Sequence, residues 1–169
     1  MCGILGAVLS DGSAVDMSAA IARLHHRGPD DTGTWESTGV YLGFVRLSIL
    51  DLSPAGHQPM VSPDGRYIIV FNGEIYNFSE LRAELVATGE KFIGHSDTEV
   101  LLRIFQRLGF ETCLSKLRGM FAFAVWDTHE ETLYCARDRL GVKPFVYAQT
   151  DRGFLFSSEI QGLFALRTD

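Results

Sequence analysis

The order of the expected elements constrains the fold more than any other feature of this sequence. Strand patterns stand at both ends of the chain, and helix patterns lie between them. Near the start, strands are expected at residues 3–9, 40–46 and 67–71. The third of these is a nearly unbroken apolar run, which is typical of a buried strand. Four short strands are expected in the last third, at residues 120–126, 132–136, 145–148 and 154–156. This order predicts a single α+β domain whose sheets are buried between helices.

Helices are expected after Asp16, Asn77 and Ser96, and as a short segment at residues 112–117. Asn77 and Ser96 each stand three residues before a glutamate, a spacing typical of helix N-termini. The helix after Ser96 should end at Gly109.

Composition excludes several classes of function. The chain has 169 residues and a net charge of −6, so it offers no basic surface for nucleic acid. It contains no apolar run of the roughly 18–20 residues that a membrane-spanning helix needs. Cys2, Cys113 and Cys135 are an odd, scattered set, which favours free thiols and a cytoplasmic location.

Cys2 is the first candidate catalytic residue. Removal of Met1 would place a thiol and a free α-amine on one residue, which is the N-terminal form of a nucleophile beside its base. The thiol and the amine have reference pKa values of about 8.5 and about 7.7–8.0. The alternative is a small buried apolar side chain at the start of a strand.

Two polar stretches that interrupt apolar strands could complete a site. Arg46 ends a strand and could present its guanidinium to a carboxylate, or it could pair with Glu36 or Asp51. Asn72-Gly73 follows another strand, where it could form an ordinary turn. Alternatively, the Asn72 amide and the Gly73 N–H could form an oxyanion hole, because glycine permits close backbone approach.

A third polar stretch contains Ser96 and Asp97. Either residue could cap the following helix, and if Ser96 is the cap, the Asp97 carboxylate is free to accept from a substrate ammonium group. Together the three stretches would suit an α-amino acid whose side-chain amide is cleaved by Cys2. The five histidines have no metal-ligand spacing, so no metal site is expected, although a Cys2–His pair stays open. Nucleotide binding has no supporting glycine-rich motif.

Eight motifs, in order along nearly the whole chain, resemble the class II glutamine amidotransferases. The nearest resemblance within that family is to the N-terminal glutaminase domain of asparagine synthetases. The motifs are Met1-Cys2-Gly3-Ile4, His26-Arg27-Gly28-Pro29-Asp30, Arg46-Leu47-Ser48-Ile49-Leu50-Asp51, Gly56-His57-Gln58-Pro59-Met60, Phe71-Asn72-Gly73-Glu74-Ile75-Tyr76-Asn77, Ser96-Asp97-Thr98-Glu99, Arg118-Gly119-Met120-Phe121-Ala122-Phe123 and Arg137-Asp138-Arg139-Leu140-Gly141-Val142-Lys143-Pro144.

The resemblance implies an N-terminal nucleophile hydrolase fold, a four-layer sandwich in which two antiparallel sheets lie between helices. It implies that Cys2 is the nucleophile and that Asn72 and Gly73 form the oxyanion hole. It also implies a set of glutamine-binding groups: the side chains of Arg46, Glu74 and Asp97, and the backbone of Leu47 and Ile49.

The implied reaction is hydrolysis of L-glutamine to glutamate and ammonia through a γ-glutamyl thioester. We expect no cofactor in this domain; ATP and magnesium belong to a synthetase domain that is expected to follow but is absent from residues 1–169. Ammonia would pass to that domain, most simply for asparagine synthesis from aspartate. The alternatives are a sugar or polysaccharide amidotransferase and a glutamine-binding regulatory module without turnover. A homodimer stays open.

Overall fold

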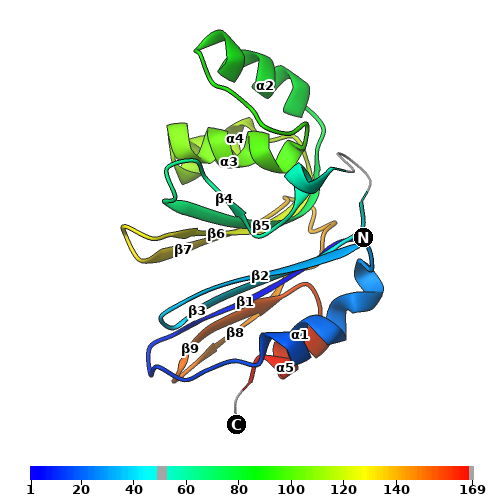
Figure 1. Cartoon of the computed structure of the whole chain (residues 1–169), viewed down its shortest axis with the longest axis vertical. Coiled ribbons are helices and arrows are strands. Elements are labelled where there is room, and N and C mark those ends of the chain that lie inside the picture. The colour runs from blue at the N-terminus through cyan, green and yellow to red at the C-terminus, as the bar shows by residue number, and fades with distance from the viewer. Residues whose placement is uncertain (49–52, 168–169) are drawn as a thin grey trace.

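The computed structural model describes residues 1–48 and 53–167 of the chain. It has four layers, two antiparallel sheets face to face with helices on each outer side (Figure 1). The expectation of a helix–sheet–sheet–helix sandwich is therefore confirmed. The N-terminus lies at the level where the two sheets meet.

The sheet that carries the N-terminus has five strands in the order β2-β3-β1-β9-β8. Its strands are β1 (Gly3–Leu9), β2 (Asp31–Ser37), β3 (Val40–Arg46), β8 (Val146–Thr150) and β9 (Gly153–Ser157). The central strand β1 pairs with β3 on one side and β9 on the other, so residues from both ends of the chain are neighbours. This pairing places the start of β1, and therefore Cys2, in the middle of the sheet edge.

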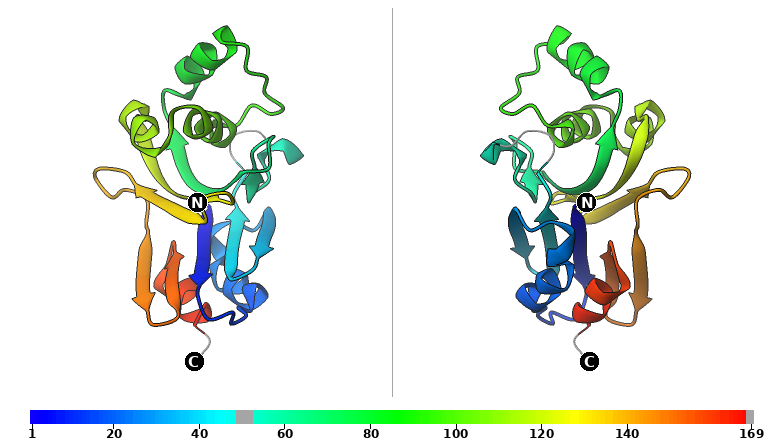
Figure 2. Two further views of the ribbon diagram at one scale, coloured as in Figure 1. Left: turned by 90° about the vertical axis from the view of Figure 1, so that its left-hand side faces the viewer. Right: turned by 90° about the vertical axis from the view of Figure 1, so that its right-hand side faces the viewer.

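The second sheet has the order β4-β5-β6-β7. Its strands are β4 (Met60–Val61), β5 (Tyr67–Ile75), β6 (Gly119–Asp127) and β7 (Thr132–Arg137). Strands β5 and β6 pair along nine residues, from Tyr67 opposite Asp127 to Ile75 opposite Gly119. The carboxyl end of β5 lies over the N-terminus of the chain in the two side views (Figure 2).

Three apolar cores follow from the layers. Ile4, Leu42, Phe44, Val70 and Phe156 belong to the core between the two sheets. The outer face of the four-stranded sheet packs against α2 (Phe78–Ala87), α3 (Asp97–Leu108) and α4 (Phe110–Lys116). The outer face of the five-stranded sheet packs against α1 (Met17–Leu24) and α5 (Ile160–Ala165). Short 3-10 turns, η1 (His25–Arg27) and η2 (Pro54–Gly56), lie in the connecting loops.

The expected elements are present, with some differences at their ends. The short fourth helix begins at Phe110 rather than at residue 112. Ser96 caps α3 by accepting from the Glu99 N–H, whereas Asn77 does not cap α2. Instead, the Asn77 amide bonds to the backbone of Lys116 and Arg118.

Strands β2 and β4 were not expected from the sequence. β2 is an edge strand with polar, half-exposed residues, so its pattern lacks an apolar face that would mark it. β4 has only two residues, Met60 and Val61. Both strands exist because the neighbouring strand supplies their hydrogen bonds.

The alternative reading of Asn72-Gly73 as a turn is wrong. Strand β5 continues to Ile75, with Asn72 opposite Ala122 and Gly73 opposite Phe121. Pairing with β6 overrides the turn preference of the Asn-Gly pair. A side chain at Gly73 would clash with the Met120 carbonyl oxygen, so this close strand approach requires glycine.

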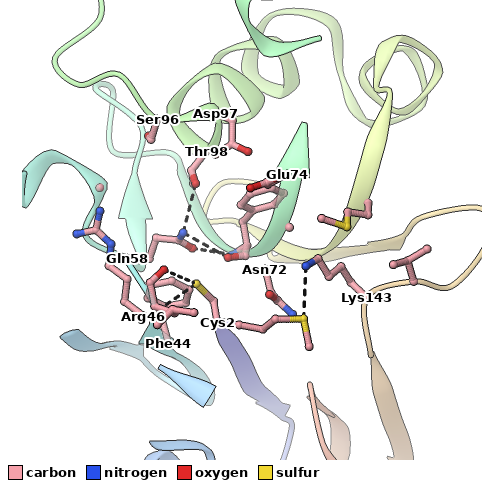
Figure 3. A pocket seen from close by; sticks show the side chains of 17 residues that line it. Cys2, Phe44, Arg46, Gln58, Asn72, Glu74, Ser96, Asp97, Thr98 and Lys143 are labelled. Carbon is pink, nitrogen blue, oxygen red and sulfur yellow. Dashed lines mark hydrogen bonds between the residues drawn. The ribbon is translucent and has the colours of Figure 1, made fainter. Parts of the chain in front are cut away.

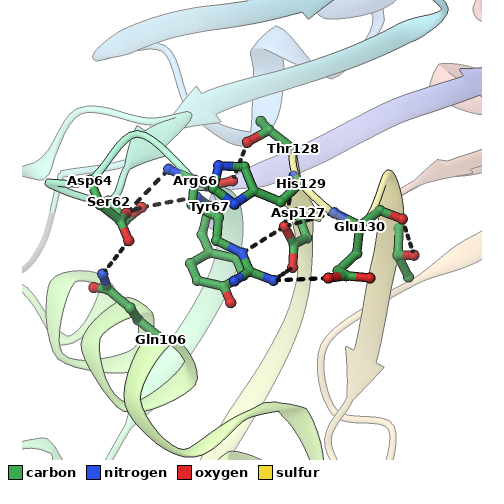
Figure 4. A network of polar contacts seen from close by, with 10 residues as sticks. Ser62, Asp64, Arg66, Tyr67, Gln106, Asp127, Thr128, His129 and Glu130 are labelled. Carbon is green, nitrogen blue, oxygen red and sulfur yellow. Dashed lines mark hydrogen bonds and ion pairs between the residues drawn. The ribbon is translucent and has the colours of Figure 1, made fainter.

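A polar network ties together the ends of the four-stranded sheet that lie away from Cys2 (Figure 4). Arg66 donates two hydrogen bonds to the buried Asp127 carboxylate, at 2.9 and 2.6 Å. The Arg66 guanidinium holds the pKa of Asp127 below its usual range. Asp64 extends the network by accepting from Gln106 of α3 at 2.8 Å. The network is therefore a structural link that joins the ends of β5 and β6 to helix α3.

Candidate active site

One cavity of about 350 Å³ lies where the start of β1 meets the carboxyl ends of β3 and β5 and the beginning of α3 (Figure 3). It brings together candidate residues that lie up to 95 positions apart in the sequence. Seven of the eight predicted site residues line it: Cys2, Arg46, Leu47, Asn72, Gly73, Glu74 and Asp97. The eighth, Ile49, lies outside the described residues.

The Cys2 thiol lies at the cavity wall beside the backbone of Leu47. Its Sγ is 3.4 Å from the Leu47 nitrogen and 3.5 Å from the Leu47 oxygen. Burial raises the pKa of the Cys2 thiol, and the hydrogen bond from the Leu47 N–H opposes this. The resting thiol is therefore protonated at neutral pH, and a nucleophilic role for it needs a base.

The segment around Arg27 fixes both Cys2 and Arg46. Arg27 Nε donates to the Cys2 carbonyl at 3.0 Å, and its Nη1 pairs with Glu159 at 2.6 Å. Gly28 lies directly against the Arg46 backbone, where an added Cβ would clash with the carbonyl carbon. The Asp30 N–H then donates to the Arg46 carbonyl at 3.0 Å. One loop thus contacts the backbone of both Cys2 and Arg46.

Arg46 is buried at the end of β3, with its Nη1 donating to the Ser53 carbonyl at 3.2 Å. The sequence left open an ion pair with Glu36 or with Asp51. Register places Asp31 opposite Arg46, whereas Glu36 lies five residues further along β2, roughly 16 Å away. Asp51 lies outside the described residues.

Asn72 provides an unpartnered donor in the cavity wall. The residue is 1% exposed, and its Nδ2 has no hydrogen-bond partner within the described part of the chain. A buried amide donor without a partner costs about 1–3 kcal/mol, so such a group is expected where a ligand atom completes it. Gly73, the next residue of β5, lines the same cavity.

Two carboxylates face the cavity from the other side. Glu74 follows Gly73 on β5, and Asp97 begins α3. Because Ser96 is the helix cap, the side chain of Asp97 is available for other bonds, and one of its oxygens accepts from the Ile75 N–H at 3.0 Å. Burial raises the pKa of Asp97 to about 6, and the negative charge of Glu74 adds to the rise.

The cavity therefore presents a cation on one side, two carboxylates on the other, and a thiol beside an unpartnered amide between them. Residues 1–168 match a family model described as a glutamine amidotransferase domain. The chain belongs to this family.

Two relatives from Bacillus subtilis (strain 168) are similar to this amidotransferase domain over nearly all of it. Asparagine synthetase [glutamine-hydrolyzing] 3 is 44% identical over 171 residues, covering 98% of this chain. Asparagine synthetase [glutamine-hydrolyzing] 1 is 42% identical over 175 residues, covering all of it. The chain spans only 28% and 27% of the lengths of these relatives.

The fold is also that of a solved amidotransferase. The glutamine phosphoribosylpyrophosphate amidotransferase from B. subtilis, complexed with ADP and GMP, superposes with a TM-score of 0.82. That match covers 98% of this chain and 43% of the other, at 21% identity. At this identity the likeness concerns the fold, and the N-terminal nucleophile architecture expected from the sequence is confirmed.

Gln58 lines the cavity of the amidotransferase domain, although no role for it was predicted from the sequence. Its Oε1 accepts from the Phe71 N–H at 2.6 Å, and its Nε2 donates to the Thr98 hydroxyl at 3.3 Å. The buried amide therefore joins the strand that carries Asn72 to the helix that carries Asp97 (Figure 3). The Gly56-His57-Gln58-Pro59-Met60 motif of the family pattern was the available signal, since the glutamine belongs to it.

Lys143 is a second cavity residue for which no role was predicted from the sequence. It lines the cavity although it lies between β7 and β8, far from Cys2 in the sequence. The Arg137–Pro144 motif belongs to the family pattern, but the pattern by itself indicates no role for the lysine.

The remaining thiols differ from Cys2. Cys113 and Cys135 are free, as expected, but burial raises the pKa of each to about 12. Among the described residues, no group of three or more histidine, cysteine, aspartate or glutamate side chains could hold a metal ion. Within the same ranges, none of the helices is long and apolar enough to cross a membrane.

Proposed function

We propose that this domain hydrolyses the side-chain amide of L-glutamine to glutamate and ammonia, with Cys2 as nucleophile. The observation that carries the proposal is the buried, unpartnered Asn72 Nδ2 in the same cavity as the Cys2 thiol. An amide donor held ready beside a nucleophile is what a tetrahedral oxyanion requires. The Gly73 N–H is the second donor.

The charges in the cavity fit the two ends of an α-amino acid. The Arg46 guanidinium would bind the α-carboxylate, because its planar fork matches a carboxylate. Glu74 and Asp97 would bind the α-ammonium group from the opposite side. Backbone atoms of Leu47 and Ile49 would add contacts to the same ligand. The side-chain amide of glutamine would then reach Cys2.

The reaction begins with transfer of the Cys2 thiol proton to its own α-amine, through a water molecule. The thiolate attacks the side-chain carbonyl carbon, and the resulting oxyanion accepts from Asn72 and Gly73. The carbon–nitrogen bond then breaks, and the amine returns its proton to the departing ammonia. Water attacks the γ-glutamyl thioester in the second half, which releases glutamate and restores the thiol. Met1 must be removed first, because its carbonyl acylates the amine.

The ammonia would pass to an ATP-dependent synthetase domain that forms asparagine from aspartate. The printed names of the relatives support this acceptor. We expect this domain to need no cofactor of its own and to work in the cytoplasm. A sugar or polysaccharide amidotransferase would keep the same glutaminase site and change only the acceptor.

A glutamine analogue with a diazoketone in place of the side-chain amide tests the proposal directly. We expect the chain lacking Met1 to gain the mass of one analogue, less dinitrogen, on its N-terminal peptide. Saturating L-glutamine should protect this peptide from modification by the analogue. The same preparation should release ammonia from glutamine. Protection by glutamine without ammonia release, in a chain lacking Met1, would instead identify a glutamine-binding module.

Protonation of Asp97 should lower kcat/KM for glutamine at acidic pH, which gives the pH profile an acidic limb. Because the pKa of Asp97 is about 6, its carboxylate becomes neutral as the pH falls through 6. It then loses its attraction for the substrate ammonium, so kcat/KM should fall below pH 6. The raised pKa also means that the folded protein binds this proton more tightly than the unfolded chain does. This contribution to folding stability therefore decreases as pH rises from about 4 to about 6.

Asp97→Asn tests this assignment, since an amide oxygen can still accept from the Ile75 N–H. We expect KM for glutamine to rise about 10- to 100-fold, the loss of one hydrogen bond to a charged group. The limb near pH 6 should disappear. Asp151→Asn removes the same charge at an exposed position and should change neither KM nor the pH profile. An unchanged KM in Asp97→Asn would exclude Asp97 from ammonium binding.

A further inference from the structure

Strand β5 has a partner strand along the whole of one edge but only along part of the other. β6 pairs with it from Tyr67 to Ile75, whereas β4 pairs only with Ile68 and Ile69. The backbone groups of β5 that face the β4 side beyond Ile69 therefore need partners of another kind, because a buried N–H without a partner is costly. We call residues 70–75 on this side the free edge of β5.

The Gly73 N–H faces this free edge. Phe121, which lies opposite Gly73 on β6, uses both of its backbone groups on Asp138. Its N–H donates to the Asp138 carboxylate at 3.2 Å, and its carbonyl accepts from the Asp138 N–H at 2.8 Å. Opposite residues of an antiparallel pair exchange both backbone bonds or neither, so Gly73 does not bond to β6. Alternate residues of a strand face the same way, so the N–H groups of Phe71 and Ile75 face the free edge too.

Side chains take the place of a partner strand on both sides of Gly73. The Phe71 N–H donates to Gln58 Oε1 at 2.6 Å, and the Phe71 carbonyl accepts from Gln58 Nε2 at 3.3 Å. The Ile75 N–H donates to the Asp97 carboxylate at 3.0 Å. Between them, the Gly73 N–H has no hydrogen-bond partner within the described residues, and Gly73 lines the cavity. An open donor thus lies between two N–H groups that side chains have satisfied.

Gln58 contacts three elements, so its side chain is a fixed support for the free edge. Its carbonyl lies against Gly33 of β2, where a side chain would clash with it. The preceding residue, His57, places its Nδ1 2.7 Å from an Asp31 carboxylate oxygen of the same strand. At the other end, Gln58 Nε2 reaches the Thr98 hydroxyl of α3 at 3.3 Å (Figure 3). Gln58 is 4% exposed, so water does not compete for these bonds.

We propose that Gln58 is a positioning residue of the oxyanion site: its side-chain amide replaces a partner strand at Phe71 and thereby holds the Gly73 N–H directed into the cavity. The proposal rests on the proposed function of Cys2. An oxyanion donor acts only within hydrogen-bond distance of the atom on which charge develops, and a misplacement of about 1 Å lowers the rate by up to about 10²-fold. Gln58 touches no reacting atom and acts through the strand.

Loss of the Gln58 amide would leave two buried backbone groups of Phe71 without partners. Such groups recover hydrogen bonds by moving toward water, and Phe71 itself lines the cavity. The free edge would therefore shift toward the cavity and carry Gly73, two residues further along, with it. Arg46 and Asp97 belong to other elements, so glutamine binding should change less than the contact with the oxyanion.

Gln58→Met tests the proposal, because methionine keeps the length and removes both hydrogen-bonding groups. In the chain lacking Met1, we expect kcat to fall about 10-fold and KM for glutamine to stay within about threefold. The amide resonance of Gly73 in proton–nitrogen spectra of the free domain should move, which a loss of stability alone would not cause. Gln106→Met removes an amide that bonds to Asp64 away from the cavity, and it should change neither kcat nor this resonance.

An unchanged kcat in folded Gln58→Met, judged by thermal unfolding, would overturn the proposal, and so would an unmoved Gly73 resonance. If Gln58→Met does not fold, hydrogen exchange of the unaltered domain decides. The Phe71 N–H should then be protected and the Gly73 N–H should exchange at least about 10-fold faster, whereas a protected Gly73 N–H would contradict the open donor. If the unaltered domain releases no ammonia, the glutaminase function fails, and a moved Gly73 resonance in Gln58→Met would still uphold the positioning role.

Discussion

Replacement of Cys2 by alanine is expected to abolish glutamine hydrolysis while the domain still folds. The thioester cannot form without the thiol, and loss of a covalent nucleophile lowers turnover by about 10⁴-fold or more. The structural cost is small, since the described hydrogen bonds of the thiol, to the Leu47 backbone, are long, at 3.4 and 3.5 Å, and alanine keeps part of the apolar packing. We expect a loss of about 1 kcal/mol in the free energy of unfolding. Ammonia release and thermal unfolding measure the two effects separately.

Cys135→Ala is the matched control for this prediction. Cys135 is also a free, partly buried thiol, and its side chain packs in the core between the sheets. Because it lies outside the cavity lining, we expect its removal to lower stability and to leave turnover within about twofold. Full ammonia release by Cys2→Ala would contradict the proposed nucleophile, whatever the control showed.

Asn72→Ala is expected to lower kcat by about 10²- to 10³-fold with little change in KM. One oxyanion donor has this effect because it acts on charge that develops only in the transition state. Stability should change by less than about 1 kcal/mol. The Nδ2 group has no described partner in the fold, so truncation removes an unsatisfied donor and offsets the cost of the small void. Steady-state kinetics and urea unfolding measure the two quantities.

Asn77→Ala should show the opposite pattern. The Asn77 amide donates to the Lys116 carbonyl and accepts from the Arg118 N–H, each at 3.0 Å. Its truncation should therefore cost about 1–2 kcal/mol of stability and leave kcat nearly unchanged. If Asn72→Ala behaved like Asn77→Ala, its amide would be a structural group and the oxyanion assignment would be wrong.

Strong apolar patterns allowed much of the fold to be predicted. Strands β1 and β3 have the expected ends, because each is a continuous apolar segment between clear breaks. Strand β2 escaped prediction because its sequence, Asp31–Ser37, is polar and its partner alone defines it. The Asn72-Gly73 pair was ambiguous for a related reason. Local preference favours a turn there, and only pairing with β6 keeps it in a strand.

The sequence by itself determined the chemical groups of the site. A cysteine behind Met1, an arginine at a strand end, an asparagine beside a glycine and the carboxylates of Glu74 and Asp97 could all be read from the motifs. The tertiary structure decided that these groups share one cavity, that Asn72 Nδ2 has no partner, and that Lys143 lies against the N-terminus. Spacing along the chain cannot reveal such facts, because burial and unpaired groups arise only when distant segments pack together.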